Sequence, residues 1–164
     1  PMARDEMEQW RSVIVFFSRK DSQREFVRRL GKKCLSIHGQ DEGTNRPQSS
    51  EERHKIIEKF QNSTEPLTIA VNYACGAEGV NLHDLNGIPR TVFLNPTTFK
   101  ADHFYQATYR AHRAGRLSTA KQRVIYIENS IEEHAKSNIE RKLRTLELLN
   151  DGDFYEEEKT KRAA

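Results

Sequence analysis

Residues 12–17, SVIVFF, give the first clear structural signal, because a short uncharged run of β-branched and aromatic residues is typical of a buried β-strand. Four similar runs follow: LSIH at 35–38, LTIAV at 67–71, TVFL at 91–94 and RVIYI at 123–127. Helical patterns separate them, and three begin with a capping box: Ser22 with Glu25, Ser49 with Glu52, and Ser130 with Glu133. This alternation predicts an α/β domain, a doubly wound, mainly parallel sheet with helices on both faces. In such sheets ligands gather at the carboxyl ends of the strands.

The composition is that of a single globular domain with a charged, hydrated surface. The chain has 164 residues, enough for one sizeable core. Its 27 lysines and arginines against 24 acidic residues give a net charge of +3, which excludes a polycation but allows a local basic surface. Six lysines or arginines and one aspartate lie between Lys100 and Arg123, a segment that suits a polyanion.

The sequence carries no targeting or metal-binding pattern. No apolar run approaches the roughly 20 residues that a membrane helix needs, and the N-terminus lacks the apolar core of a signal peptide. We therefore expect a soluble, intracellular protein. Cys34 and Cys75 lie far apart, without a CxxC pair or a histidine cluster. They predict two buried thiols in a reducing compartment, and neither a disulfide nor a zinc site.

We divide the chain into a lead-in at 1–11, which can form a helix, one domain at 12–150, and a tail at 151–164 that we expect to be flexible. The opening Pro1-Met2 is typical of a remnant of expression. The domain ends in a helical pattern whose apolar residues recur at spacings of three and four: Ile131, Ala135, Ile139, Leu143, Leu146 and Leu149. This stripe predicts a helix face packed against the core.

The segment QATYRAHRAGR, residues 106–116, concentrates arginine among small residues. On a helix, Gln106, Arg110 and Arg113 share one face. Three alanines form a stripe beside that face and allow close approach to the sheet: Ala107, Ala111 and Ala114. A solvated face with paired charges is the simpler interpretation, but Asp102 is the one acidic residue nearby. The arginines therefore need a partner from elsewhere, and guanidiniums suit phosphate oxygens.

This segment resembles motif VI of the superfamily-two helicases, in particular the Swi/Snf-like DNA-dependent ATPases, whose pattern is close to QAxDRxHRxGQ. Companion motifs stand in that family's order: VIVFFSRKDSQREFVRRL resembles motif IV and its helix, SSEERHKIIEKFQ the next segment, CGAEGVNL motif V, NP at 95–96 the Trp-Asn-Pro turn, and SIEEHAKSNIERKLRTLELL the closing helix. The resemblance covers residues 12–150. It implies the second of two RecA-like lobes, a helicase C-terminal domain.

In that family ATP and Mg²⁺ are held mainly by the first RecA-like lobe, which brings a phosphate-binding glycine loop and an acidic box. This chain has neither pattern, so the resemblance implies that a first lobe is its partner and that it does not turn over ATP alone. By the same resemblance, Arg113 is the principal arginine finger and Arg110 its partner at the γ-phosphate. Gln106 orients their helix, Gly79 brings the backbone close to the nucleotide, and Asn81 contacts the ribose.

The resemblance also implies translocation on double-stranded DNA, with bound protein displaced or remodelled. Double-stranded DNA, chromatin included, would be the partner, in the nucleus if the host is a eukaryote. Asn72 stands near a usual DNA-phosphate contact, and Arg116 replaces the closing Gln of motif VI, so both are candidate nucleic-acid contacts. Two alternatives stay open: a catalytically inactive lobe that serves as a nucleic-acid or protein platform, and an RNA helicase lobe. The wording of motif VI favours the DNA branch.

Overall fold

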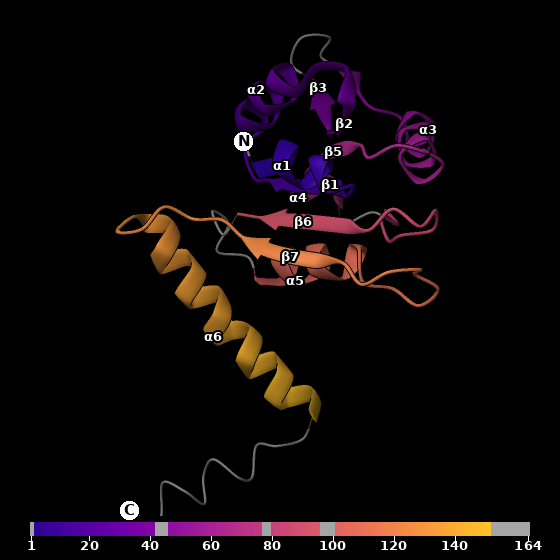
Figure 1. Ribbon diagram of the computed structural model, residues 1–164. Coiled ribbons are helices and arrows are strands. Elements are labelled where there is room, and N and C mark those ends of the chain that lie inside the picture. Colours follow the sequence, from indigo (N-terminus) through magenta and orange to yellow (C-terminus); the bar gives the residue numbers. More distant parts are fainter. Residues whose placement is uncertain (1, 42–45, 77–79, 96–100, 152–164) are drawn as a thin grey trace, which may run out of the picture.

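The computed structural model describes residues 2–41, 46–76, 80–95 and 101–151. In this part of the chain one parallel sheet of five strands has the order β2-β5-β1-β6-β7 (Figure 1). The strands are β1 Ser12–Phe17, β2 Cys34–Ile37, β5 Thr68–Asn72, β6 Arg90–Leu94 and β7 Lys121–Val124. A separate antiparallel pair joins β3 Gln40–Asp41 to β4 Arg46–Pro47. The parallel sheet confirms the predicted fold class.

Helices cover both faces of this sheet. They are α1 Met2–Glu8, α2 Lys20–Leu30, α3 Ser50–Gln61, α4 Tyr73–Gly76, α5 Ala101–Arg110 and α6 Ile131–Asp151, with a short 3-10 helix, η1 Gly31–Lys33. Side chains alternate between the two faces of β1 and so divide the core into two clusters. Ile14 and Phe16 pack with residues of α3 to α6, whereas Val13 and Val15 pack with residues of α1 and α2. No helix within the described ranges is both long and apolar enough to cross a membrane.

The two cysteines lie inside the fold as thiols that form no disulfide with each other. Cys34 and Cys75 are both buried, as predicted. Burial raises the pKa of the Cys34 thiol to about 12, against a backbone hydrogen bond from Ala70 that lowers it. Cys34 is therefore protonated at neutral pH and a poor nucleophile.

The capping box of α3 is present as predicted. The Ser49 hydroxyl accepts a hydrogen bond from the Glu52 N–H (3.1 Å), and the Glu52 carboxylate accepts one from the Ser49 N–H (2.7 Å). The prediction at Ser22 is wrong, because α2 already begins at Lys20 and Ser22 lies within its first turn. The box before α6 is altered: the Ser130 hydroxyl accepts from the Glu132 N–H (3.1 Å), and the Glu133 carboxylate accepts from the N–H of Asn129 instead of Ser130 (2.8 Å).

We expect Ser49→Ala to lower the free energy of unfolding by about 1 kcal/mol, because the Glu52 N–H at the start of α3 loses its side-chain cap. Urea denaturation followed by circular dichroism measures this change. Ser50→Ala is the matched control, since Ser50 is the exposed first residue of the same helix and not its cap. Equal midpoints for the two variants would contradict the stabilising role of the box.

The last predicted strand is placed differently by the structure. β7 covers Lys121–Val124 and not 123–127, and all four of its residues are exposed. Ile125 and Ile127 lie beyond it and are exposed as well. The prediction of a buried strand is wrong because β7 is the edge of the sheet, where it hydrogen-bonds to β6 on one side alone.

The apolar stripe of α6 reaches the core through its middle. Ala135 and Ile139 are each 1% exposed, and Leu143 packs against the same cluster, whereas Ile131 is 71% exposed. The core-facing prediction is therefore wrong for Ile131. Helix α6 crosses α5 and then extends away from the sheet (Figure 1). The side chains of Leu146 and Leu149 lie outside the described part of the molecule.

Candidate active site

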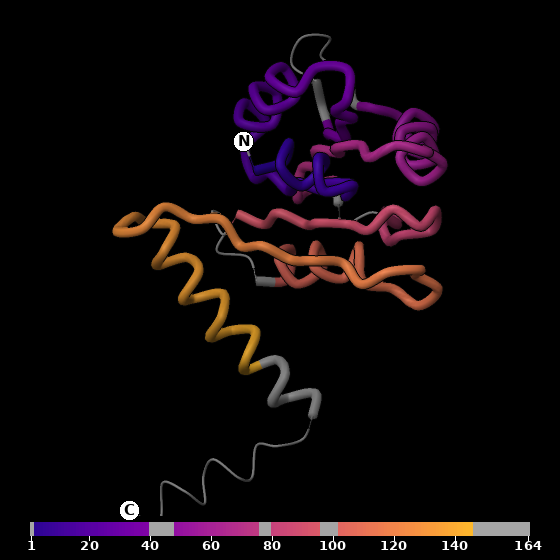
Figure 2. The backbone as a smooth tube through the Cα atoms, in the orientation of Figure 1, coloured from indigo at the N-terminus to yellow at the C-terminus, as the bar shows by residue number. Residues whose placement is uncertain are grey.

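Two loops meet at the edge of the sheet where β6 and β7 begin (Figure 2). One is residues 80–89, which lead into β6; the other, which we call the arginine loop, is residues 111–118, between α5 and β7. Helix α5 starts beyond the carboxyl end of β6 and returns antiparallel to the strands, so it ends at their amino edge. The arginines of the site therefore lie opposite the edge where the sequence pattern placed ligands.

The arginine loop begins earlier than the sequence pattern suggests. Helix α5 ends at Arg110, whose carbonyl accepts a hydrogen bond from the N–H of Leu82 (3.1 Å). Arg113 therefore stands on the loop, and the prediction that it shares a helical face with Gln106 and Arg110 is wrong. Of the predicted alanine stripe, Ala107 and Ala111 are buried whereas Ala114 is exposed, for the same reason.

Arg110 and Arg113 are two like charges that affect each other. Arg110 is 8% exposed, while Arg113 is exposed to solvent. Burial lowers the pKa of Arg110, and the charge of Arg113 lowers it further. No ion pair recorded among the described residues involves Arg113. A phosphate group would relieve this repulsion, so the pair fits an anionic ligand.

Two of the other predicted nucleotide residues, Asn81 and Gln106, lie on the elements that carry or contact Arg110. Asn81 is exposed and precedes Leu82, the residue bonded to Arg110, and its carbonyl accepts a hydrogen bond from the Gln61 amide (2.9 Å). Gln106 is exposed on α5, one turn before Arg110. Gly79 lies outside the described residues. The structure thus brings Asn81 and both arginines together, and their roles toward a nucleotide stay predictions.

The two predicted nucleic-acid contacts lie at opposite edges of the sheet. Asn72 ends β5 at the carboxyl edge; it is 7% exposed, and its side-chain oxygen accepts a hydrogen bond from the Ala74 N–H (3.1 Å), which caps α4. Arg116 belongs to the arginine loop, where its guanidinium donates to the Arg113 carbonyl (3.3 Å). A single ligand surface does not join them.

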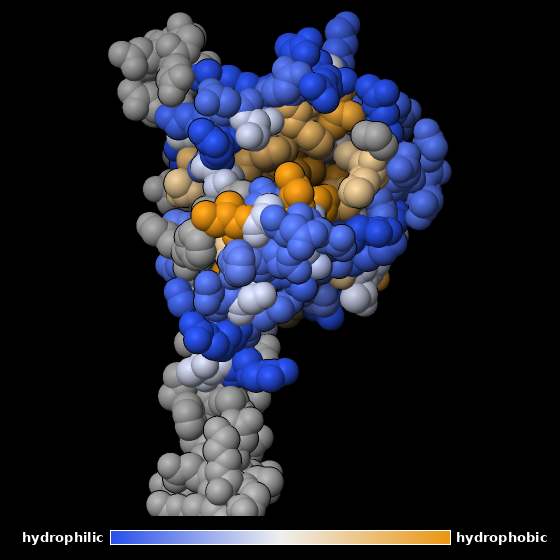
Figure 3. Space-filling model, turned by 90° about the vertical axis from the view of Figure 1, so that its left-hand side faces the viewer, coloured by the Kyte–Doolittle hydropathy of each residue, from blue (hydrophilic) through white to orange (hydrophobic). Residues whose placement is uncertain are grey.

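The carboxyl edge carries an apolar hollow (Figure 3). Its volume is about 420 Å³. Apolar side chains from the ends of β1 and β6, from α2 and from the segment after β7 line most of it: Val15, Phe16, Phe17, Phe26, Phe93, Leu94 and Ile125. Polar groups lie at Arg19, Asn95 and Glu132.

Arg90 is a buried cation that the sequence analysis did not single out. It is 0% exposed, and its guanidinium lies 4.6 Å from the centre of the Phe60 ring. It donates to the side-chain oxygens of Gln61 (3.1 Å) and Asn86 (3.2 Å). Burial lowers the pKa of Arg90 to about 10, against the charge of Asp84, which raises it. The sequence signal that could have identified this buried cation is an arginine at the start of an apolar strand.

His83 was also missed, although it follows motif V directly. The residue is 8% exposed. Burial lowers the pKa of His83, the charges of Arg113 and Arg90 lower it further, and Asp84 opposes them. Its imidazole is therefore neutral at pH 7, and it lies within range of the electrostatic effect of Arg113. No group of three or more histidine, cysteine or acidic side chains within the described ranges is arranged to hold a metal ion.

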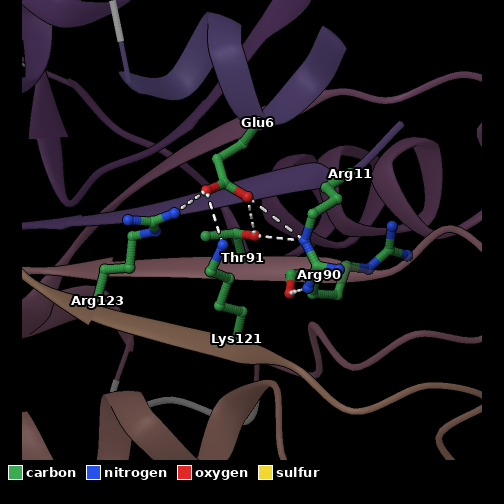
Figure 4. Close-up of polar contacts among 6 residues, drawn as sticks. All are labelled: Glu6, Arg11, Arg90, Thr91, Lys121 and Arg123. Carbon is green, nitrogen blue, oxygen red and sulfur yellow. Dashed lines mark hydrogen bonds and ion pairs between the residues drawn. The ribbon is translucent and has the colours of Figure 1, made fainter. Parts of the chain in front are cut away.

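Glu6 anchors the N-terminal helix through a buried ion-pair cluster (Figure 4). The residue is 3% exposed, and its carboxylate lies 3.4 Å from Arg11, 3.4 Å from Lys121 and 2.8 Å from Arg123. The Thr91 hydroxyl donates to it (2.7 Å) and accepts from Arg11 (2.7 Å). The cluster ties α1 to β6 and β7. Sequence patterns missed it because its members are up to 117 positions apart.

Comparisons with known proteins agree with this architecture. Residues 2–115 match the family described as the helicase conserved C-terminal domain. A putative ATP-dependent RNA helicase of Acanthamoeba polyphaga mimivirus is 33% identical over 150 residues, which are 90% of this chain and 26% of the relative. An uncharacterized ATP-dependent helicase of Mycoplasma pneumoniae is 32% identical over 111 residues, 66% of this chain and 10% of the relative.

A solved structure shares the fold. The crystal structure of the C-terminal part of the Fun30 ATPase domain matches with a TM-score of 0.65 at 21% identity, over 80% of this chain and 40% of that one. This chain spans about a quarter and a tenth of the two curated relatives, so it corresponds to one part of each. Since the family match extends over more than half of its residues, the chain belongs to the helicase C-terminal domain family.

Proposed function

We propose that this chain is the second motor lobe of an ATP-dependent double-stranded DNA translocase of the Swi/Snf-like kind. In this role it supplies arginine fingers to ATP that a first RecA-like lobe holds. The observation that carries the proposal is the position of Arg113, exposed on a loop whose two ends are bonded to the 80–89 loop, next to the like charge of Arg110. An exposed guanidinium next to a second like charge is a suitable ligand for the negative charge of the γ-phosphate.

The residues present fit ATP at the amino edge of the sheet. Bound with Mg²⁺ on the first lobe, ATP supplies the phosphoryl group for transfer. Arg113 and Arg110 would neutralise charge on that group, and Asn81, which lies beside them, would bind the ribose. Gln106 would orient the end of α5, and Gly79 would bring the backbone to the nucleotide.

Nucleic acid would lie at the carboxyl edge, away from the arginine loop. Asn72 is the candidate contact there, and a lobe with ATP on one edge and nucleic acid on the other can couple closure to movement along the strand. Arg116 is the second candidate, at the amino edge. Double-stranded DNA is supported by the motif VI wording, and chromatin is the natural substrate of such a motor in a nucleus. The name of the mimivirus relative specifies RNA, so RNA is the competing substrate.

The test is the ATPase rate of the full-length protein that contains this chain, measured without nucleic acid, with double-stranded DNA and with double-stranded RNA. We expect stimulation by DNA. Greater stimulation by RNA would mean that the substrate is RNA and not DNA, while the proposed motor function would stand. No turnover with any nucleic acid would overturn the motor and favour the platform function, in which the arginines hold phosphates without chemistry. Binding measured by fluorescence anisotropy over a salt series then reports how many phosphates are contacted.

A further inference from the structure

The arginine loop rests on one buried carboxylate. Asp84 is 1% exposed and lies in the 80–89 loop. Its carbonyl accepts a hydrogen bond from the Leu117 N–H (2.9 Å), and its carboxylate oxygen Oδ2 accepts one from the Ser118 hydroxyl (2.6 Å). One residue thus holds the last two positions of the arginine loop, through its main chain and its side chain together.

Asp84 is itself fixed by its own loop. Its other carboxylate oxygen, Oδ1, accepts from the N–H of Asn86 (3.2 Å) and from the N–H of Gly87 (2.8 Å). Gly87 adopts φ +80, a left-handed conformation that glycine takes at little cost and that closes this turn. Three donors converge on the carboxylate, and hydrogen bonds to an ionised acceptor are about twice as strong as neutral ones. Asp84 is therefore a rigid support.

The exposed middle of the arginine loop has weaker bonds of its own. The N–H and the guanidinium of Arg116 both donate to the Arg113 carbonyl, at 3.4 and 3.3 Å, and Gly115 turns the chain with φ +84. The Leu82 bond to the Arg110 carbonyl holds the amino end. Without the Asp84 bonds, the segment that carries Arg113 would be held firmly at one end alone.

We propose that Asp84 is a positioning residue, which fixes the arginine loop through Leu117 and Ser118 and so directs Arg113 toward the first lobe. The catalytic half of this inference rests on the proposed function. Misplacement of a reacting group by about 1 Å is enough to cost on the order of 100-fold in rate, so a support of this kind has a measurable effect. It differs from a general stabilising contact because it acts on one loop.

The test begins with Ser118→Ala in the full-length protein, because replacing Asp84 itself would also remove the acceptor for Asn86 and Gly87. Hydrogen–deuterium exchange, followed without nucleotide, should be faster over residues 111–117 and unchanged in the β-strands. Thr119→Ala is the matched control, since it removes an adjacent but exposed hydroxyl. Ser118→Thr keeps the donor and should restore slow exchange. Unchanged exchange in Ser118→Ala would overturn the support role.

ATPase kinetics of the same variants test the catalytic half. We expect kcat of Ser118→Ala to fall roughly 10-fold to 100-fold with KM for ATP nearly constant, because the finger acts during phosphoryl transfer and not in binding. Thr119→Ala should match wild type, and Ser118→Thr should recover most of the rate. If Arg113→Ala is inactive while Ser118→Ala is fully active, this inference fails alone. If Arg113→Ala is fully active, the proposed function fails as well.

Discussion

Arg113→Ala should abolish nucleic-acid-stimulated ATP turnover in the full-length protein. Arginine fingers raise kcat by about 10³ to 10⁵ in related phosphoryl transfer, which corresponds to roughly 4–7 kcal/mol of transition-state stabilisation. Arg113 is exposed and bonded to its surroundings mainly through its carbonyl, so the fold should not depend on its side chain. We therefore expect kcat to fall by at least three orders of magnitude at saturating ATP, with the thermal unfolding midpoint unchanged.

A matched control separates the finger from loss of positive charge. Arg144→Ala removes an exposed arginine on α6, far along the chain from the arginine loop, and should leave kcat within twofold of wild type. Arg113→Lys keeps the charge but loses the planar donor array, so its rate should stay far below wild type. Wild-type turnover in Arg113→Ala, with stimulation intact, would refute the finger assignment.

Glu6→Ala should be strongly destabilising, although Glu6 lies outside the candidate site. Removal of the buried carboxylate leaves the positive charges of Arg11, Lys121 and Arg123 without the negative charge that they share. It also removes the acceptor for the Thr91 hydroxyl. Lys121 and Arg123 are nearly half exposed and can turn toward water, which limits the loss. We expect the free energy of unfolding to fall by about 3 kcal/mol in a urea titration.

The neighbouring residue Glu8 provides the comparison, because it is an exposed glutamate on the same helix. Glu8→Ala should change stability by less than about 0.5 kcal/mol. Equal effects of the two substitutions would show that α1 is not anchored through Glu6.

Acid titration provides a second check on the Glu6 cluster. Burial pushes the pKa of Glu6 upward, but the Thr91 hydrogen bond and the charges of Lys121 and Arg123 outweigh it and hold that pKa below its ordinary value of 4.5. Folding therefore favours the ionised form. The stability it contributes is complete above pH 4.5 and is lost as the pH falls through the lowered pKa. The difference in free energy of unfolding between wild type and Glu6→Gln should therefore become smaller over that acidic range.

Local patterns predicted most of the architecture. Runs such as SVIVFF place a strand because β-branched and aromatic side chains suit a pleated, buried surface, and Ser49 places a helix start because its cap reaches three residues along the chain. These causes act between near neighbours. They failed where the environment decided the outcome: RVIYI was predicted as a buried strand, but β7 is exposed because it forms the edge of the sheet.

The sequence singled out the residues of the candidate site, whose roles stay predictions, but not their geometry. The arginines of QATYRAHRAGR were found because their number exceeds what nearby acids can pair. The end of α5 at Arg110 was not predicted. The Arg110 carbonyl accepts a hydrogen bond from the Leu82 N–H, 28 positions earlier, and this contact exists only in the folded chain.

The sequence by itself therefore determined a parallel α/β domain with a basic segment near its end, since periodicity, capping and composition are properties of short segments. Only the tertiary structure decided that the arginine loop lies at the amino edge of the sheet, that Asp84 supports it, and that Glu6 and Arg90 are buried charges. The physical reason is distance along the chain. The desolvation of a charge and the bonds that compensate it depend on groups that meet only when remote strands pair.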